Sequence, residues 1–90
     1  MANVYATLLP SKDADIIFLD GEDVYNCYLQ PSVSNVSGAA LDTLPVWRIE
    51  KIEKTEADGV VRYRRLFPNG NPAFGFVAAD YKLYNYSFKQ

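Results

Sequence analysis

The sequence predicts a small all-β domain of mainly antiparallel strands, arranged as a small sandwich or a barrel-like sheet of five or six strands. Short runs rich in β-branched and aromatic residues alternate along the chain with clusters of Gly, Pro, Asn and Asp, a pattern typical of strands joined by turns. With 49% hydrophobic and 14% aromatic residues in 90, the composition is globular and leaves room for one domain. We divide the chain into an N-terminal arm, residues 1–15, and a single β domain, residues 16–90, with a long loop at 30–45.

The clearest element is a hairpin over residues 46–67, in which two strand-like runs flank Asp58-Gly59. Asp-Gly between such runs strongly indicates a two-residue turn, because Gly adopts positive φ without strain. Trp47 and Ile49 alternate to one side of the first strand, but Ile52 has the opposite parity. Either a bulge shifts the register or both faces of the strand are partly covered.

Charged residues line both strands of this hairpin. We expect three glutamates of the first strand to lie opposite three arginines of the second, namely Glu50, Glu53 and Glu56 opposite Arg62, Arg64 and Arg65. Exposed pairs of this kind are worth only a few tenths of a kcal/mol. We therefore interpret the hairpin as solvated or as part of an interface.

Before this hairpin come the arm and a shorter hairpin. The arm contains Pro10, which cannot donate to a central ladder, so we expect an extended arm or edge strand that is loosely ordered or held against a partner. Residues 16–19 and 24–29 read as strands joined by a four-residue loop, residues 20–23.

Residues 30–45 are rich in Ser, Asn, Gly and Ala and lie between Pro31 and Pro45. A loop of this length in a small domain usually has a function or is ordered by a neighbour, so it is a candidate partner-contacting region. A mobile surface loop is an equally good interpretation.

After the central hairpin, residues 68–72 predict a tight turn with its reversal at Asn69-Gly70, and residues 73–77 predict a strand. The last segment, residues 80–89, alternates and predicts a final strand with an aromatic face. These aromatic residues are either core or a binding platform, for example for carbohydrate.

The residue types argue against an enzyme and against a metal site. The chain has no histidine and one cysteine, Cys27, which excludes an internal disulfide, the usual zinc ligand sets and the histidine-dependent triads. Cys27 lies in a strand-like run and reads as a small buried hydrophobe. We therefore expect no catalytic residue, no cofactor and no metal ligand.

Charge is divided unevenly along the chain. Residues 1–45 carry six acidic residues and one basic residue, a net −5, and residues 46–90 carry eight basic and five acidic residues, a net +3. The acidic half opposes phosphate, so we expect no nucleic-acid partner, whereas neighbouring copies packed head to tail would satisfy the split. No run of about 18 apolar residues exists, so we expect no membrane partner.

Residues 46–86 resemble a family of small, mostly uncharacterised proteins encoded in the structural regions of tailed-bacteriophage genomes. The family pattern is W-x-I-x-K-I, an Asp-Gly turn, an aromatic residue followed by G-N-x-x-F, and a closing D-x-x-x-x-x-Y. This chain has its counterparts at Trp47, Ile49, Lys51, Ile52, Asp58, Gly59, Phe67, Gly70, Asn71, Phe74, Asp80 and Tyr86. It departs from the family at Ala78 and Ala79, where a tryptophan and an acidic residue are common, and at Tyr81 and Tyr84, where an arginine and a leucine are common. These motifs are mainly apolar and turn positions, so they report a shared fold more than a shared chemistry.

The resemblance implies a non-enzymatic virion component, made in the host bacterial cytoplasm, whose partners are other virion proteins and further copies of itself. We expect a small cement or adaptor protein, and the alternative is a free-standing module that binds carbohydrate or a host protein. The expected protein contacts are Val4, Tyr5, Leu8, Leu9, Val33, Val36 and Leu41, with Arg62, Arg64 and Arg65 as a weaker polar patch. The expected core is Trp47, Ile49, Phe74, Phe76 and Tyr86.

Overall fold

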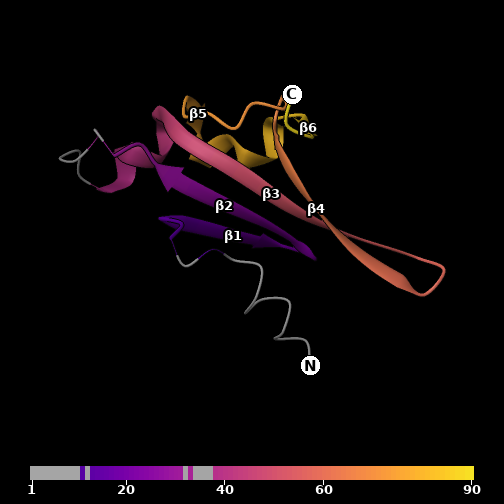
Figure 1. Cartoon of the computed structure of the whole chain (residues 1–90). Helices are drawn as coiled ribbons and strands as arrows, with labels where there is room; N and C mark the ends of the chain where they lie inside the picture. Colours follow the sequence, from indigo (N-terminus) through magenta and orange to yellow (C-terminus); the bar gives the residue numbers. More distant parts are fainter. Residues whose placement is uncertain (1–10, 12, 32, 34–37) are drawn as a thin grey trace.

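The computed structural model describes residues 11, 13–31, 33 and 38–90, which form an open, antiparallel six-stranded sheet (Figure 1). The strand order is β1-β2-β3-β4-β6, and β5 pairs with β3 outside this path. The elements are β1 (Ile16–Asp20), β2 (Asp23–Leu29), the 3-10 helix η1 (Gly38–Thr43), β3 (Pro45–Ala57), β4 (Val60–Pro68), β5 (Phe76–Val77), the 3-10 helix η2 (Ala78–Leu83) and β6 (Tyr86–Ser87). The predicted all-β, mainly antiparallel class is confirmed. The sheet does not close into a barrel.

The central hairpin forms as predicted. β3 and β4 pair from Lys51↔Leu66 to Ala57↔Val60 and reverse at Asp58-Gly59. Asp58 and Gly59 have φ angles of 54° and 77°, the pair of positive values that a tight two-residue hairpin turn requires. Local turn chemistry is therefore sufficient to place this hairpin.

The first hairpin is tighter than the sequence suggests. Asp20 pairs directly with Asp23, so the connection is the two-residue turn Gly21-Glu22 and not a four-residue loop. Gly21 adopts a φ of +64°, which allows the shorter reversal. The two aspartates extend the ladder by one pair beyond the predicted strands.

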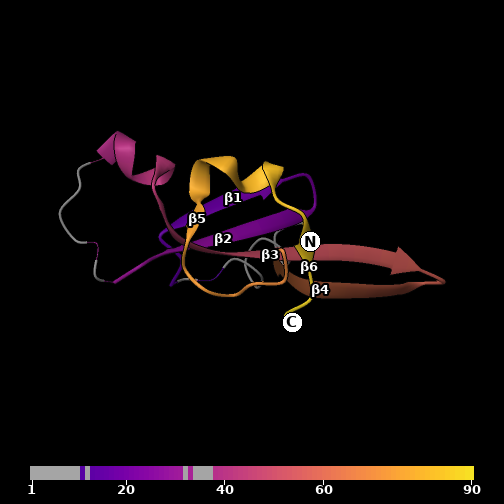
Figure 2. The same cartoon turned by 90° about the horizontal axis from the view of Figure 1, so that it is seen from above.

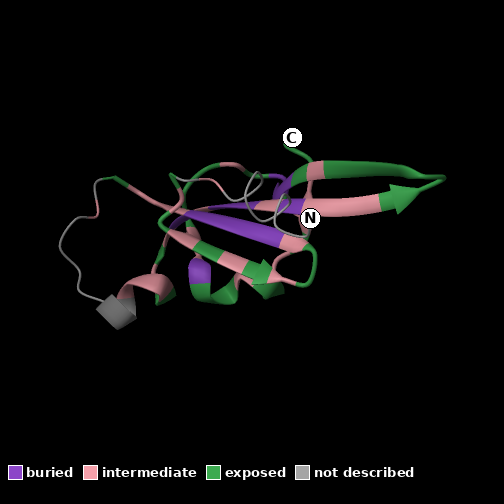
Figure 3. Ribbon diagram, turned by 90° about the horizontal axis from the view of Figure 1, so that it is seen from below, coloured by how far each residue is buried: buried purple, intermediate pink, exposed green. Residues whose placement is uncertain are grey.

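The sheet has two covered faces, and this resolves the parity of Ile52. β2 and β3 pair without a register shift from Val24↔Ile52 to Leu29↔Trp47, so alternation is strict across both strands. One face, here called the aromatic face, carries the buried Cys27, Trp47 and Ile49. The opposite face, here called the polar face, carries Val24, Asn26, Tyr28, Arg48, Glu50 and Ile52. Figure 3 shows that the buried residues concentrate in β2 and the inner part of β3. No bulge is needed at Ile52, because it is buried on the polar face.

The aromatic face is covered by η2 and the residues that follow it (Figure 2). The predicted final strand over residues 80–89 is wrong for most of its length, since only Tyr86 and Ser87 form a strand. The reason is that Ala78, Tyr81 and Tyr84 are also spaced by three, the period of a 3-10 helix, and this periodicity prevails. The strand predicted over 73–77 is likewise reduced to Phe76–Val77.

Four of the five residues expected in the core belong to it or pack against it. Trp47 and Ile49 are buried, and the half-buried Phe76 and Tyr86 pack against the same cluster. Phe74 contradicts the prediction, because it is 39% exposed. Its position precedes β5, so no ladder fixes its side chain on the covered face.

The predicted turn after the central hairpin is confirmed, and the predicted loop contains a short 3-10 helix. Asn69 and Gly70 both have positive φ, and the Gly70 amide donates to the Phe67 carbonyl over 3.0 Å. Within the predicted loop at 30–45, η1 occupies Gly38–Thr43. The predicted arm falls largely on residues 1–10 and 12, which lie outside the described residues.

Candidate functional site

A buried polar cluster lies at the centre of the polar face. Asn26 and Glu50 are opposite each other on β2 and β3, and the Asn26 side-chain amide donates to the Glu50 carboxylate over 3.2 Å. The Tyr28 hydroxyl donates to the same Glu50 oxygen over 3.5 Å, and Arg65 Nε lies 2.9 Å from the other. The Ser11 amide donates to Asn26 Oδ1 over 3.1 Å. These contacts satisfy the carboxylate from several sides, as a buried charge requires.

Arg48 extends this cluster toward the turn that follows β4. Its guanidinium lies over the rings of Tyr28 and Phe67, 5.0 and 5.6 Å from their centroids, and its Nε donates to the Pro72 carbonyl over 2.9 Å. The planar guanidinium is suited to stacking and donating at once. Arg48 thus fastens the 68–72 turn to the sheet.

The contacts of this cluster form a network between strands. Glu50 is the one carboxylate among its described members, and its oxygens contact Asn26, Tyr28 and Arg65. Across the described ranges, no three Asp, Glu or Cys side chains gather as a metal site would require. The cluster supplies stability and specific pairing of β2, β3 and β4.

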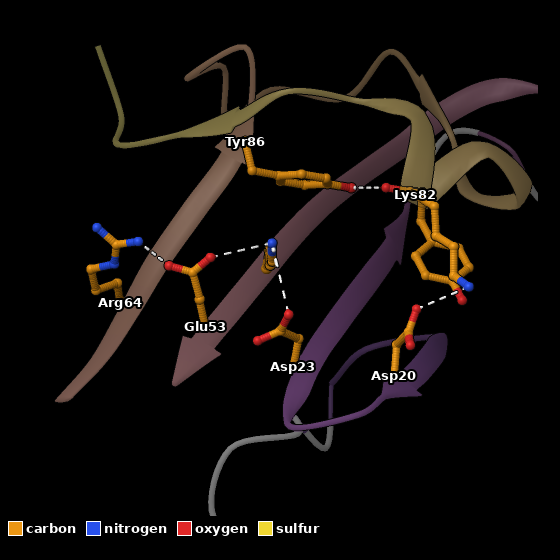
Figure 4. Close-up of polar contacts among 8 residues, drawn as sticks. Asp20, Asp23, Glu53, Arg64, Lys82 and Tyr86 are labelled. Carbon is orange, nitrogen blue, oxygen red and sulfur yellow. Dashed lines mark hydrogen bonds and ion pairs between the residues drawn. The ribbon is translucent and has the colours of Figure 1, made fainter. Parts of the chain in front are cut away.

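A second set of charges runs across the edge of the aromatic face (Figure 4). Arg64 on β4 pairs with Glu53 on β3, and Lys51 bridges Glu53 and Asp23 at 3.4 and 3.9 Å. The Arg64 guanidinium, bonded to Glu53, holds the pKa of that carboxyl below its ordinary value. Lys51 Nζ also lies 5.5 Å from the centroid of the Tyr86 ring. This chain of charges fixes the base of the hairpin against the sheet.

The C-terminal tyrosines are structural rather than a free platform. Tyr81 stacks on Phe18 with ring centroids 4.1 Å apart and meets Tyr25 edge-on at 4.7 Å. The Tyr84 hydroxyl accepts from the Val77 amide over 2.9 Å, and the Tyr86 hydroxyl donates to the Tyr81 carbonyl over 2.6 Å (Figure 4). The ring of Tyr81 and the hydroxyls of Tyr84 and Tyr86 therefore make contacts within the fold.

Cys27 is buried, as the sequence suggested. Burial raises the pKa of its thiol to about 12, so almost none of it is thiolate near neutral pH. It is therefore inert in the folded protein.

The least covered region is the outer half of the central hairpin. Pairing with β2 ends at Ile52, so residues 53–64, here called the ribbon, continue as two strands alone and project from the sheet (Figure 1). Val60, Val61 and Tyr63 on the ribbon are exposed large hydrophobic residues. An exposed two-stranded ribbon with apolar side chains is typical of a contact surface.

Of the predicted contact residues apart from the arginines, five lie outside the described residues and two are described. Val4, Tyr5, Leu8, Leu9 and Val36 lie outside the described residues. Leu41 is used internally, because its side chain packs against the core and its carbonyl accepts from Trp47 Nε1 over 3.0 Å, and Val33 is half-buried. The structure thus uses Leu41 in the protein's own core.

The three arginines of the predicted polar patch lie on β4 but have different surroundings. Of the glutamates expected to lie across from them, Glu53 is directly opposite Arg64 and binds it. Arg65 lies opposite Ile52 but binds Glu50, and Glu56 lies opposite Val61 instead of an arginine. Arg62 faces Thr55, and among the described residues it has no ion-pair partner. It is the most available of the three for an external contact.

No family model, curated protein or solved structure matches the chain. The geometry described above is therefore the basis for proposing a function. In the part of the chain that the structure describes, no helix is long and apolar enough to cross a bilayer.

Sequence reasoning missed the polar cluster. Asn26 and Glu50 stand in strands of mixed polarity, where a polar residue usually faces solvent. The available signal was Ile52, whose parity matches that of Glu50 and indicated that the same face is covered.

Proposed function

We propose that this protein is a non-enzymatic structural component of a tailed-bacteriophage particle, a small cement or adaptor that joins larger virion proteins. The observation that carries the assembly role is the ribbon, which projects from a well-covered sheet and exposes Val60, Val61 and Tyr63. The phage setting rests on the sequence resemblance over residues 46–86.

The physical argument is that such a ribbon gains stability from a partner. An isolated two-stranded hairpin is marginally stable in water, and its free edges present unpaired backbone donors and acceptors. A neighbouring protein that adds a strand pairs with these backbone groups, and one that covers the apolar side chains stabilises the ribbon. The folded sheet then acts as the rigid base from which the ribbon reaches.

The ribbon also fits contact better than catalysis. Its exposed apolar side chains lie beside charged ones, and β4 contributes Arg62 and Arg64 to it, a residue type enriched in protein interfaces. A carbohydrate platform built from the C-terminal tyrosines is disfavoured, because Tyr81, Tyr84 and Tyr86 pack internally.

A variant with a shortened ribbon tests this function. Deleting Thr55, Glu56, Val61 and Arg62 removes two cross-strand pairs, keeps the Asp58-Gly59 turn and preserves the alternation of both strands. When tagged chains are expressed in the bacterium that carries the gene during particle production, the unaltered protein is expected to sediment with the particles. The shortened variant is expected to remain unattached.

The matched control is Leu83→Ser, which removes an exposed apolar side chain from η2 and leaves the ribbon intact. It is expected to sediment like the unaltered protein. An unaltered chain that never sediments with particles, or a shortened variant that still does, contradicts the proposal.

A further inference from the structure

The sheet ends in two open edges. Within the described residues, β1 has a neighbouring strand only on its β2 side. At the other end, β6 pairs with β4 only at Phe67 and Pro68, so no strand of the described part of the chain pairs with the outer edge of residues 60–66. Both edges present backbone groups that another strand can pair with.

The two edges carry opposite charge. Around β1, the described residues 13–23 include five acidic residues, Asp13, Asp15, Asp20, Glu22 and Asp23, and no basic residue. β4 carries Arg62, Arg64 and Arg65 and no acidic residue. Some of these charges are met internally, for example Asp20 by Lys82 at 3.2 Å (Figure 4). Asp13, Asp15 and Arg62 have no ion-pair partner among the described residues, so a complementary excess is left at each edge.

The two edges also expose apolar side chains on the same face of the sheet. Ile17 and Leu19 of β1 are 39% and 61% exposed, and their partners in β2 place them on the polar face. Val61 and Tyr63 of β4 are 45% and 44% exposed and lie on that same face by the β3–β4 register. All four side chains are therefore far more exposed than the core residues.

We propose that the β1 edge of one copy pairs with the free β4 edge of the next, so that copies join head to tail into a continuous sheet. The proposal rests on the proposed function and names a second copy as a partner of the ribbon. The β1 strand has five residues, and the free stretch of β4 has seven, since two of its nine residues pair with β6. The strand therefore fits on the available edge.

Strand direction supports this arrangement. All neighbouring strands are antiparallel, so β1 and β3 run one way and β2 and β4 the other. A β1 strand placed beside β4 is then antiparallel to it without the second copy being turned over, and the polar face continues from copy to copy. In the register that sets Leu19 opposite Val61, Ile17 lies opposite Tyr63, and both apolar pairs are on that face. Asp15 then lies opposite Arg65.

Symmetric pairing of like edges is disfavoured. Two β1 edges would bring acidic residues against acidic residues, and two β4 edges would bring arginines together, which is destabilising for directly opposed like charges. Contact between two different edges repeats and generates a ring or an open filament. Such assembly suits a component present in several copies.

Cysteine cross-linking tests both the pairing and its polarity. Leu19→Cys and Val61→Cys are made as separate variants, mixed and exposed to mild oxidation. Directly opposed residues in antiparallel strands have Cα atoms about 4.5–5.5 Å apart, within the range that a disulfide bridges. Cys27 does not compete, because it is buried and its thiol pKa is about 12.

The expected result is a disulfide-linked dimer in the mixture and none in either variant alone. A second pair, Ile17→Cys with Tyr63→Cys, is expected to behave alike, and the mismatched mixture of Ile17→Cys with Val61→Cys is expected to link at least tenfold more slowly. Cross-linking of Leu19→Cys with itself, or no cross-linking in either matched mixture, overturns the proposal. Trp47 fluorescence verifies that each variant is folded.

Charge provides an independent readout by light scattering across protein concentrations. Arg62→Glu is expected to weaken self-association at least tenfold at low salt, whereas Lys89→Glu, the same change of charge at an exposed residue near the C-terminus, is expected to leave it unchanged. Equal effects of the two substitutions contradict the edge pairing.

These outcomes are separable from those of the proposed function. A chain that fails to cross-link but still sediments with particles through its ribbon contradicts the head-to-tail pairing alone. A chain that cross-links as expected but never sediments with particles contradicts the virion role and leaves the pairing intact.

Discussion

The inner sheet and the ribbon share a strand, β3, but differ in what surrounds it. From Trp47 to Ile52, β3 lies beside β2 and beneath η2, and Trp47, Ile49, Glu50 and Ile52 are buried there. From Glu53 onward it pairs only with β4, none of its residues is buried, and Glu56 and Ala57 at its end are exposed (Figure 3). The same alternating type of sequence therefore gives a core strand in one half and part of an uncovered two-stranded ribbon in the other. The number of segments that pack around the strand decides whether its residues are buried or exposed. Burial is what makes an apolar residue stabilising.

The two regions are therefore held together by different interactions. The inner sheet holds its shape through packing and through a satisfied polar cluster around Glu50. The ribbon is held by its Asp58-Gly59 turn, its ladder and exposed pairs, each of which contributes little. We expect substitutions to be costly for stability in the first region and for contacts in the second.

The largest contrast is expected between Trp47→Ala and Tyr63→Ala. Trp47 is 2% exposed and its indole N–H donates to the Leu41 carbonyl, so truncation should lower the free energy of unfolding by about 3–5 kcal/mol. Tyr63 is on the exposed ribbon, and its loss should cost about 1 kcal/mol or less. Urea unfolding followed by circular dichroism measures both. Losses of similar size would mean that the ribbon is as well covered as the core.

A smaller contrast is expected between two glutamates of the same strand and the same parity. Glu50→Ala removes the carboxylate that accepts from the buried Asn26 side-chain amide and should cost about 2–3 kcal/mol. Glu56→Ala removes an exposed carboxylate and should change stability by about 0.5 kcal/mol or less. The same urea titration measures them. A neutral Glu50→Ala would show that the cluster is not needed for stability.

The smallest effect concerns the pH dependence of the Glu53–Arg64 pair at the base of the ribbon. Since Arg64 lowers the folded pKa of Glu53 below its ordinary value of 4.5, the pair stabilises the fold above that value. This stability is lost as the pH falls through the folded pKa. Glu53→Gln should therefore cost about 0.5–1 kcal/mol near pH 7 and almost nothing near pH 2. Unfolding midpoints of both proteins across this range measure it, and a difference that does not shrink in acid would contradict the pairing.

The parts of the fold that sequence predicted well are those set by local chemistry. Asp58-Gly59 and Asn69-Gly70 specify turns through the positive φ of their own residues, so both reversals were predicted at the correct positions. Trp47 and Ile49 were correctly assigned to the core from their size and alternation. The polar patch predicted at Arg62, Arg64 and Arg65 stays a prediction, and of these three arginines only Arg62 lacks an ion-pair partner among the described residues.

The incorrect predictions concern residues whose structure depends on distant segments of the chain and not on local chemistry. Residues 80–89 alternate like a strand, but residues 80–83 belong to η2, where Tyr81 contacts Phe18 and Tyr25. Phe74 was assigned to the core by its likeness to Phe76, but β5 begins only at Phe76. Leu41 was taken for an outward contact, whereas it lies against Trp47 through a long-range approach that no local pattern encodes.

By itself, then, the sequence determined the all-β class, the central hairpin with its turns, and the uneven distribution of charge along the chain. Only the tertiary structure decided that both faces of β2 and β3 are covered, that Glu50 and Asn26 form a buried pair, and that the hairpin projects beyond the sheet. The physical reason is that turns and alternation depend on a few adjacent residues. Burial depends on which distant segment packs against a face, and that is fixed only when the whole chain folds.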